Sequence, residues 1–302
     1  MAISADNPLA CCRSFLFIPG ADASALRDAV KTGADVLVQE LEDFTPPSRR
    51  PQARQIAVQV MTHWRECGHC SAVRINPFET CGQEDLEAVM AARPEIVMMS
   101  KVESRAQVEE LHRRIGMLES RYRIEPGSTL IVPNIETALG VVRAIEIAKA
   151  SPRVQAMLVA TEDMVSDLGA GRSRAGTELF YARSRFLLEC AAAGVLAIDS
   201  PYTFADDAGA EADMQFGQSI GYQAKGVVNP AHVAVANRYL TPSLAAVALA
   251  QRHIAAFEQA SREGAARAEV DGLVVEVPSY FQAKRLLGRH EQLNSMQALR
   301  SH

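Results

Sequence analysis

Short apolar runs alternate along this chain with longer stretches in which apolar side chains recur every three or four positions. The short runs are almost continuously apolar, as expected of strands that are covered on both faces. The longer stretches, such as 104–115 and 177–193, have the period of amphipathic helices. Eight runs are predicted to be strands: 14–19, 34–41, 71–76, 95–101, 129–136, 154–162, 195–199 and 224–228. Eight strand–helix units in a chain of 302 residues predict an α/β fold, a (β/α)8 TIM barrel.

The main alternative is an open, doubly wound parallel sheet. That fold usually carries a glycine-rich GxGxxG turn after its first strand, and here the first strand ends in Ile18-Pro19-Gly20-Ala21-Asp22. The barrel is predicted to span residues 1–240. Residues 241–302 follow as a helical extension, which is too small for a core of its own. We expect this extension to pack on the barrel or on a neighbouring subunit, or to cover the active site.

Composition narrows the class of partner. A net charge of −5 and a pI near 5.9, with no run of basic residues, argue against nucleic acid or an anionic membrane surface. No apolar run approaches the ~20 residues of a membrane span, and residues 1–10 do not resemble a signal peptide. Six cysteines are few for this length, and Cys67-Gly68-His69-Cys70 has no second pair at zinc spacing. Free thiols in a reducing cytoplasm are therefore expected.

Charged residues follow almost every predicted strand, and the carboxyl ends of barrel strands are where TIM-barrel enzymes carry their chemistry. Two apolar runs end in carboxylates, Glu136 and Asp163, 27 positions apart. Neighbouring parallel strands bring such carboxylates together, and a hard divalent cation such as Mg2+ relieves their repulsion. The sequence thus predicts a Mg2+ site formed by Glu136 and Asp163.

Five further residues are candidates for binding or catalysis. Arg74 lies inside an apolar strand and cannot be buried there unpaired, so it either contacts substrate or pairs with Glu42 or Glu136. Glu42 and Asp43 either take part in proton transfer or cap the next turn. Lys101 either binds substrate or pairs with a neighbour such as Glu103. Asp199 is expected to contact the ligand directly or through another residue.

In chain order, these strand-end motifs resemble the HpcH/HpaI aldolase and citrate lyase β-subunit family, and most closely its CitE-like acyl-thioester lyase branch. The resemblance covers about residues 13–240. The segments that carry it are Arg13–Gly20, Glu40-Leu41-Glu42-Asp43, Val73–Asn76, Lys101–Ser104, Ile135-Glu136-Thr137 with Gly140, Thr161–Asp163 with Asp167–Gly169, Tyr181–Arg185 and Ala197–Asp199.

This resemblance implies Mg2+ held by Glu136 and Asp163, and Arg74 on the carboxylate and carbonyl of a 2-oxo acid. The implied reaction is cleavage of a 3-hydroxyacyl-CoA of the citryl, malyl or citramalyl type into an acyl-CoA and a 2-oxo acid. An aldolase acting on free 4-hydroxy-2-oxo acids, an acyl-CoA thioesterase and a non-catalytic metabolite-binding homologue are the alternatives. The family also implies a homotrimer or hexamer whose C-terminal segment reaches a neighbouring active site.

Several positions depart from the family pattern. The chain has Glu40, Ser100 and Asn229 where the family commonly has Asp, Pro and His. It has Glu276 where the thioester lyases carry an Asp, which makes Glu276 the candidate proton donor. The CoA phosphates need basic partners, for which Arg13, Arg49 and Arg50 are the candidates.

Overall fold

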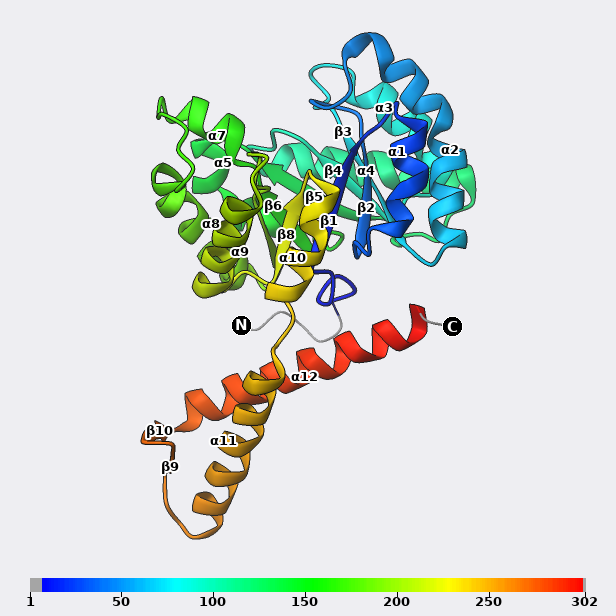
Figure 1. The fold of residues 1–302 in the computed structure, drawn as a ribbon. Coiled ribbons are helices and arrows are strands. Elements are labelled where there is room, and N and C mark those ends of the chain that lie inside the picture. The colour runs from blue at the N-terminus through cyan, green and yellow to red at the C-terminus, as the bar shows by residue number, and fades with distance from the viewer. Residues whose placement is uncertain (1–6, 301–302) are drawn as a thin grey trace. The chain divides into compact units, whose positions relative to one another are not determined.

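The computed structural model describes residues 7–300, with side chains for residues 7–296. Eight parallel strands close into a barrel in chain order, and β1 pairs with both β2 and β8 (Figure 1). The strands are β1 (Ser14–Pro19), β2 (Val36–Glu40), β3 (Cys70–Ile75), β4 (Ile96–Met99), β5 (Leu130–Ile135), β6 (Ala156–Val159), β7 (Leu196–Asp199) and β8 (Ala224–Val227). The predicted TIM barrel is confirmed.

Helices connect the strands and surround the barrel (Figure 1). They are α1 (Ala23–Asp28), α2 (Arg50–Glu66), α3 (Gly82–Val89), α4 (Arg105–Tyr122), α5 (Ala138–Val142), α6 (Ala144–Ala148), α7 (Thr161–Asp167), α8 (Phe180–Ala193), α9 (Asp207–Ile220) and α10 (Val233–Tyr239). Single 3-10 turns η1 (Ala29–Lys31), η2 (Pro47–Arg49), η3 (Met90–Ala92), η4 (Thr177–Leu179) and η5 (Pro230–His232) adjoin them.

Several strands end earlier than the sequence predicts, because local backbone signals interrupt them. Lys101, two residues beyond β4, has a left-handed φ of 56°, which no strand residue adopts. Ser104 then caps α4 in a capping box with Gln107. The predicted sixth strand ends at Val159 because α7 already begins at Thr161. The charged residues after these strands therefore lie on loops and helix starts at the mouth of the barrel.

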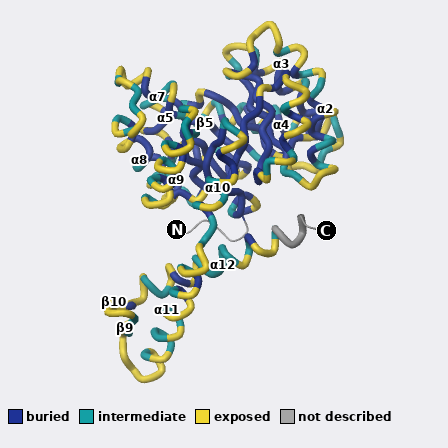
Figure 2. The backbone as a smooth tube through the Cα atoms, viewed as in Figure 1, coloured by how far each residue is buried: buried dark blue, intermediate teal, exposed yellow. Residues whose placement is uncertain are grey.

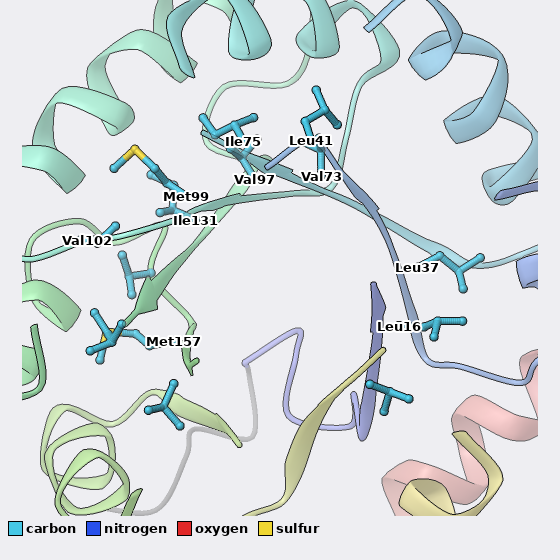
Figure 3. Close-up of a cluster of buried hydrophobic side chains, with 14 of the residues drawn as sticks. Leu16, Leu37, Leu41, Val73, Ile75, Val97, Met99, Val102, Ile131 and Met157 are labelled. Carbon is cyan, nitrogen blue, oxygen red and sulfur yellow. The ribbon is translucent and has the colours of Figure 1, made fainter. Parts of the chain in front are cut away.

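Alternate residues of each strand belong to two separate hydrophobic layers. Phe15 and Phe17 belong to the layer inside the barrel, whereas Leu16 and Ile18 belong to the layer between the strands and the helices. Figure 3 shows part of the outer layer, and Figure 2 shows that the buried residues concentrate in the strands. Because this alternation continues to the strand ends, Glu40, Arg74 and Glu136 fall on the inward-facing side.

The described residues from Thr241 onward form a second compact unit, and the division falls between Leu240 and Thr241. The unit contains α11 (Leu244–Arg262), a hairpin of β9 (Ala268–Val270) and β10 (Leu273–Val275), and α12 (Val277–Arg300). The two helices pack through stacked rings of Phe257 and Tyr280, 4.9 Å apart. Glu276 lies exposed immediately before α12. The two helices agree with the helical extension expected for this part of the chain.

One segment, Pro230–Arg262, is long and apolar enough to cross a membrane by length and composition alone. It is not a single helix, because residues 240–243 separate α10 from α11. It therefore gives only weak support for a membrane span.

Candidate active site

The centre of the candidate site is Arg74, which projects from β3 toward the barrel axis and is buried. Its Nε donates to Glu40 Oε1 at 2.8 Å. The same carboxylate accepts the backbone N–H groups of Glu42 and Phe44, each at 2.6 Å. The guanidinium also lies over the Phe17 and Phe44 rings, 5.3 and 5.7 Å from their centroids. Glu40 thus fixes one edge of Arg74, a role that the sequence did not indicate.

Glu42 connects Arg74 to the next part of the site. Its Oε2 lies 3.2 Å from Arg74 Nη2, and its Oε1 lies 2.9 Å from Lys101 Nζ. Asp43, half exposed, lies 3.7 Å from the same Arg74 nitrogen. Burial raises the pKa of Glu42, although the charges of Arg74 and Lys101 oppose that change. A carboxylate with a raised pKa is a better proton acceptor than an ordinary glutamate.

Lys101 joins Glu42 to Asp163. Its Nζ lies 3.3 Å from Asp163 Oδ2, and its side chain is 44% exposed. Glu42 and Asp163 raise the pKa of Lys101 even though burial lowers it, so the side chain stays cationic. The left-handed φ of 56° at this lysine is a strained conformation of the kind that clusters at functional sites. Glu103, the other partner considered for Lys101, instead accepts a hydrogen bond from Thr137 Oγ1 at 2.7 Å.

Glu136 and Asp163 meet beside this network. Burial raises the pKa of Glu136 well above its usual range, and the nearby carboxyl groups of Glu42 and Asp163 raise it further against the opposing charge of Arg74. Glu136 Oε1 is a buried atom that accepts no hydrogen bond, whereas Asp163 Oδ2, also buried, lies 3.3 Å from the Lys101 ammonium. A buried acceptor such as Glu136 Oε1 is costly unless a donor or a cation satisfies it.

A Mg2+ ion fits these two carboxylates. Carboxylate oxygen is the ligand type that Mg2+ prefers, and Mg2+ is commonly held by one or two carboxylates with water and substrate oxygens completing its shell. Within residues 7–296, no group of three or more His, Cys, Asp and Glu side chains is arranged as a metal site. The protein's share of such a site would therefore be Glu136 and Asp163.

The structure does not bring Asp199 to this site, and we correct that expectation. Leu196 and Ile198 belong to the layer inside the barrel, so Asp199 faces outward toward α8 and α9. There it accepts from Arg183 Nε at 2.9 Å and from Lys225 Nζ at 2.8 Å. Both cations also pair with Asp213, at 2.8 and 2.6 Å. This buried cluster joins strands β7 and β8 to the two helices that cover them.

Arg13 is likewise remote from the site. It directly precedes β1, at the amino-terminal end of the barrel, and its Nε is paired with Asp35 Oδ2 at 2.8 Å. The expectation that Arg13 binds a CoA phosphate is therefore corrected. Arg49 and Arg50 adjoin the start of α2, and Arg50 Nη2 donates to the carbonyl of Glu42 at 3.3 Å. Asn229 caps η5, accepting from the N–H of Ala231 at 3.1 Å.

Comparisons with known proteins bear directly on this arrangement. Residues 13–230 match the model of the HpcH/HpaI aldolase/citrate lyase family. The chain is 32% identical over 281 residues to the citrate lyase subunit beta of Escherichia coli, covering 92% of this chain and 93% of that protein. It is 31% identical over 289 residues to a (3S)-malyl-CoA thioesterase of Cereibacter sphaeroides, covering 95% and 97%.

A solved structure agrees with the sequence relatives. The structure of CitE from Mycobacterium tuberculosis in complex with magnesium, acetoacetate and coenzyme A has a TM-score of 0.75 and 27% identity to this chain. The match covers 93% of this chain and 98% of the CitE chain. The fold, the barrel-mouth carboxylates and these likenesses lead to one conclusion: the chain belongs to the HpcH/HpaI aldolase/citrate lyase family.

Proposed function

We propose that this protein is a Mg2+-dependent carbon–carbon lyase. Its substrate would be a 3-hydroxyacyl-CoA of the citryl, malyl or citramalyl type, and its products an acyl-CoA and a 2-oxo acid. The observation that carries the proposal is the meeting of Glu136, which has an unpartnered buried oxygen, with Asp163, beside the fixed guanidinium of Arg74. The similar CitE protein, whose structure contains magnesium, acetoacetate and coenzyme A, supports the choice of ligands.

Arg74 would bind the carboxylate of the substrate and stay next to the oxygen that becomes the carbonyl of the oxo acid. Its position is fixed by Glu40 before the substrate arrives, so little reorganisation is needed as charge develops. Mg2+, held by Glu136 and Asp163, would supply a Lewis acid for the hydroxyl and carboxylate oxygens.

Cleavage needs one proton acceptor and one proton donor. A carboxylate takes the proton of the substrate hydroxyl, the carbon–carbon bond breaks, and its electron pair moves into the thioester as an enolate. Glu42, whose pKa burial raises, and Asp43 are the candidate acceptors. An acid then protonates the enolate carbon, and Glu276 remains the proposed donor.

Hydrolysis of the thioester is the second candidate function. The observation that favours it is the 31% identity to a protein named (3S)-malyl-CoA thioesterase, nearly as high as the identity to citrate lyase subunit beta. The two reactions differ in their products. A lyase releases an acyl-CoA and a 2-oxo acid, whereas a thioesterase releases free CoA and the intact hydroxy acid.

The test is a product analysis with a panel of 3-hydroxyacyl-CoA thioesters, with Mg2+ and with EDTA. The wild type is run beside Glu136→Ala and Glu276→Ala. Metal-dependent release of acyl-CoA and oxo acid, lost in Glu136→Ala, is the expected result. Loss in Glu276→Ala as well would place the second unit in the reaction. Free CoA with the hydroxy acid would establish hydrolysis, and turnover of free hydroxy-oxo acids alone would establish an aldolase.

A further inference from the structure

Asn134 is a polar residue on the inner face of the barrel that no catalytic assignment above uses. It lies on β5, where Val132 belongs to the inner layer and Ile131 and Ile135 belong to the outer one. Asn134 therefore faces the barrel axis. Its side chain is 0% exposed, and neither Oδ1 nor Nδ2 has a hydrogen-bond partner. Within the part of the chain described, no other side chain has two such atoms.

An unpartnered amide in this place is costly. Its strand neighbour across the β5–β6 pairing is Leu158, and Met98 and Val132 are further members of the same apolar layer. A buried polar group without a partner loses its hydrogen bonds to water and gains nothing in exchange. Leucine or valine would continue the apolar pattern without that cost. Buried, unsatisfied groups that persist in a fold are expected at functional positions.

The position of Asn134 relative to the site explains what the amide could bind. Asn134 and Glu136 lie two residues apart on the same face, and Asn134 is the deeper of the two because β5 runs toward the mouth. Glu136 Oε1 is also unpartnered. Around it the site is rich in carboxylates, from Glu42, Glu136 and Asp163. A neutral amide can donate to an anionic ligand there without adding to this negative charge.

We propose that Asn134 is a substrate-binding residue that forms the floor of the site. Its Nδ2 would donate to an oxygen of the 2-oxo-acid part of the ligand. This inference rests on the proposed function, because it takes the ligand class from there. It adds a residue that selects for a small polar acid over an apolar one, since an apolar ligand would leave the amide unpaired.

A ligand can reach this floor at modest cost. The ion pair that spans the mouth joins Lys101 to Asp163, and both side chains are about half exposed, at 44% and 43%. Ion pairs with this much solvent contact contribute little to stability. An entering acid could therefore separate Lys101 from Asp163 without disturbing the buried Arg74–Glu40 pair.

The experiment compares Asn134→Leu with the wild type in two measurements. The first is the thermal unfolding midpoint without ligand. The second is the Kd of pyruvate, of glyoxylate and of oxaloacetate, titrated calorimetrically at saturating Mg2+. Asn134→Val is measured in parallel in case leucine overpacks the layer. Met98→Leu, a volume-conserving change in the same layer, is the matched control.

We expect Asn134→Leu to raise Tm by about 2–6 °C, since it removes two unsatisfied buried atoms. We expect the Kd of the best-bound oxo acid to rise about 10-fold, while Met98→Leu changes neither quantity appreciably. An unchanged Kd with a raised Tm would mean that the amide binds no substrate, and a lowered Tm would mean that it stabilises the protein itself. Either result overturns the inference. A wild type that binds no oxo acid overturns the proposed function, and with it the inference.

Discussion

One substitution tests whether Asp199 contacts the ligand or only stabilises the fold. Asp199 belongs to a buried cluster with Arg183, Lys225 and Asp213. Replacing Asp199 by Asn leaves one acceptor oxygen and places an NH2 group against two cations. The wild-type carboxylate accepts from Arg183 Nη2 at 2.5 Å, from Arg183 Nε at 2.9 Å and from Lys225 Nζ at 2.8 Å. Removing one member of a buried ion pair costs about 3–5 kcal/mol. Because Asp213 still pairs with both cations, we expect a loss of about 2–4 kcal/mol, or about 5–10 °C in Tm.

The assay has two parts, urea unfolding and kcat/KM measured well below the unfolding transition. We expect the free energy of unfolding to fall while kcat/KM of the folded protein changes less than about threefold. Asp28→Asn is the control, since Asp28 forms an exposed pair with Lys31 and should show no resolvable change. Unchanged stability together with a large fall in kcat/KM would refute the reasoning, because it would place Asp199 in contact with the ligand.

Three other predictions follow from single interactions. Arg74→Lys should lower kcat/KM by at least about 100-fold, since lysine cannot hold Glu40 and Glu42 in the same fixed fork; activity close to wild type would exclude the assigned role. Lys101→Met should tighten Mg2+ binding to the substrate-free protein several-fold by calorimetry, with Lys31→Met unchanged; weaker binding would mean that Lys101 supports the metal instead of competing with it. Burial raises the pKa of Glu119. Arg153 and the backbone N–H groups of Gly127 and Thr129 lower this pKa by more than burial raises it, so the net pKa lies below the usual value. The stability from this pair is present above about pH 4.5 and lost as pH falls through the lowered pKa, so Glu119→Gln should cost about 2–3 kcal/mol at pH 7 and progressively less below pH 4; a pH-independent cost would contradict this linkage.

Much of the fold could be predicted from the sequence because each strand has a recognisable apolar pattern. Near-continuous apolar runs indicate strands covered on both faces, and eight of them separated by helices leave few alternatives to a barrel. The same reasoning placed Glu136 and Asp163 together, since neighbouring parallel strands end at the same edge. The resemblance to a known family added the roles, while the meeting of these two carboxylates follows from topology alone.

The residues whose positions or partners the sequence did not reveal were missed for different physical reasons. A continuously apolar strand hides which face each residue occupies, so Asp199 looked like other strand-end acids although it faces the helices. Alternation along β7 shows that Asp199 and Ile198 face opposite sides, but the sequence does not show which of the two faces the barrel axis. Arg13 directly precedes β1, so it lies at the amino-terminal end of the barrel, opposite the end that carries the candidate site. Glu40 as the partner of Arg74, and Lys101 as a bridge to Asp163, depend on pairing between loops that no local pattern specifies.

The closure of β1 against β8 ties the folding of this chain to its synthesis. Ser14 pairs with Lys225, so about 210 residues must be made between the two partners. At ribosomal rates of about 5–20 residues per second, the free edge of β1 waits roughly 10–40 s for its partner. During that time an apolar strand with unpaired backbone groups is open to pairing with other chains. Chains that are released before β8 is complete would therefore be poor folders even when every residue of the Arg74–Glu136 site is already present, and chaperone demand should be highest just before the eighth strand emerges.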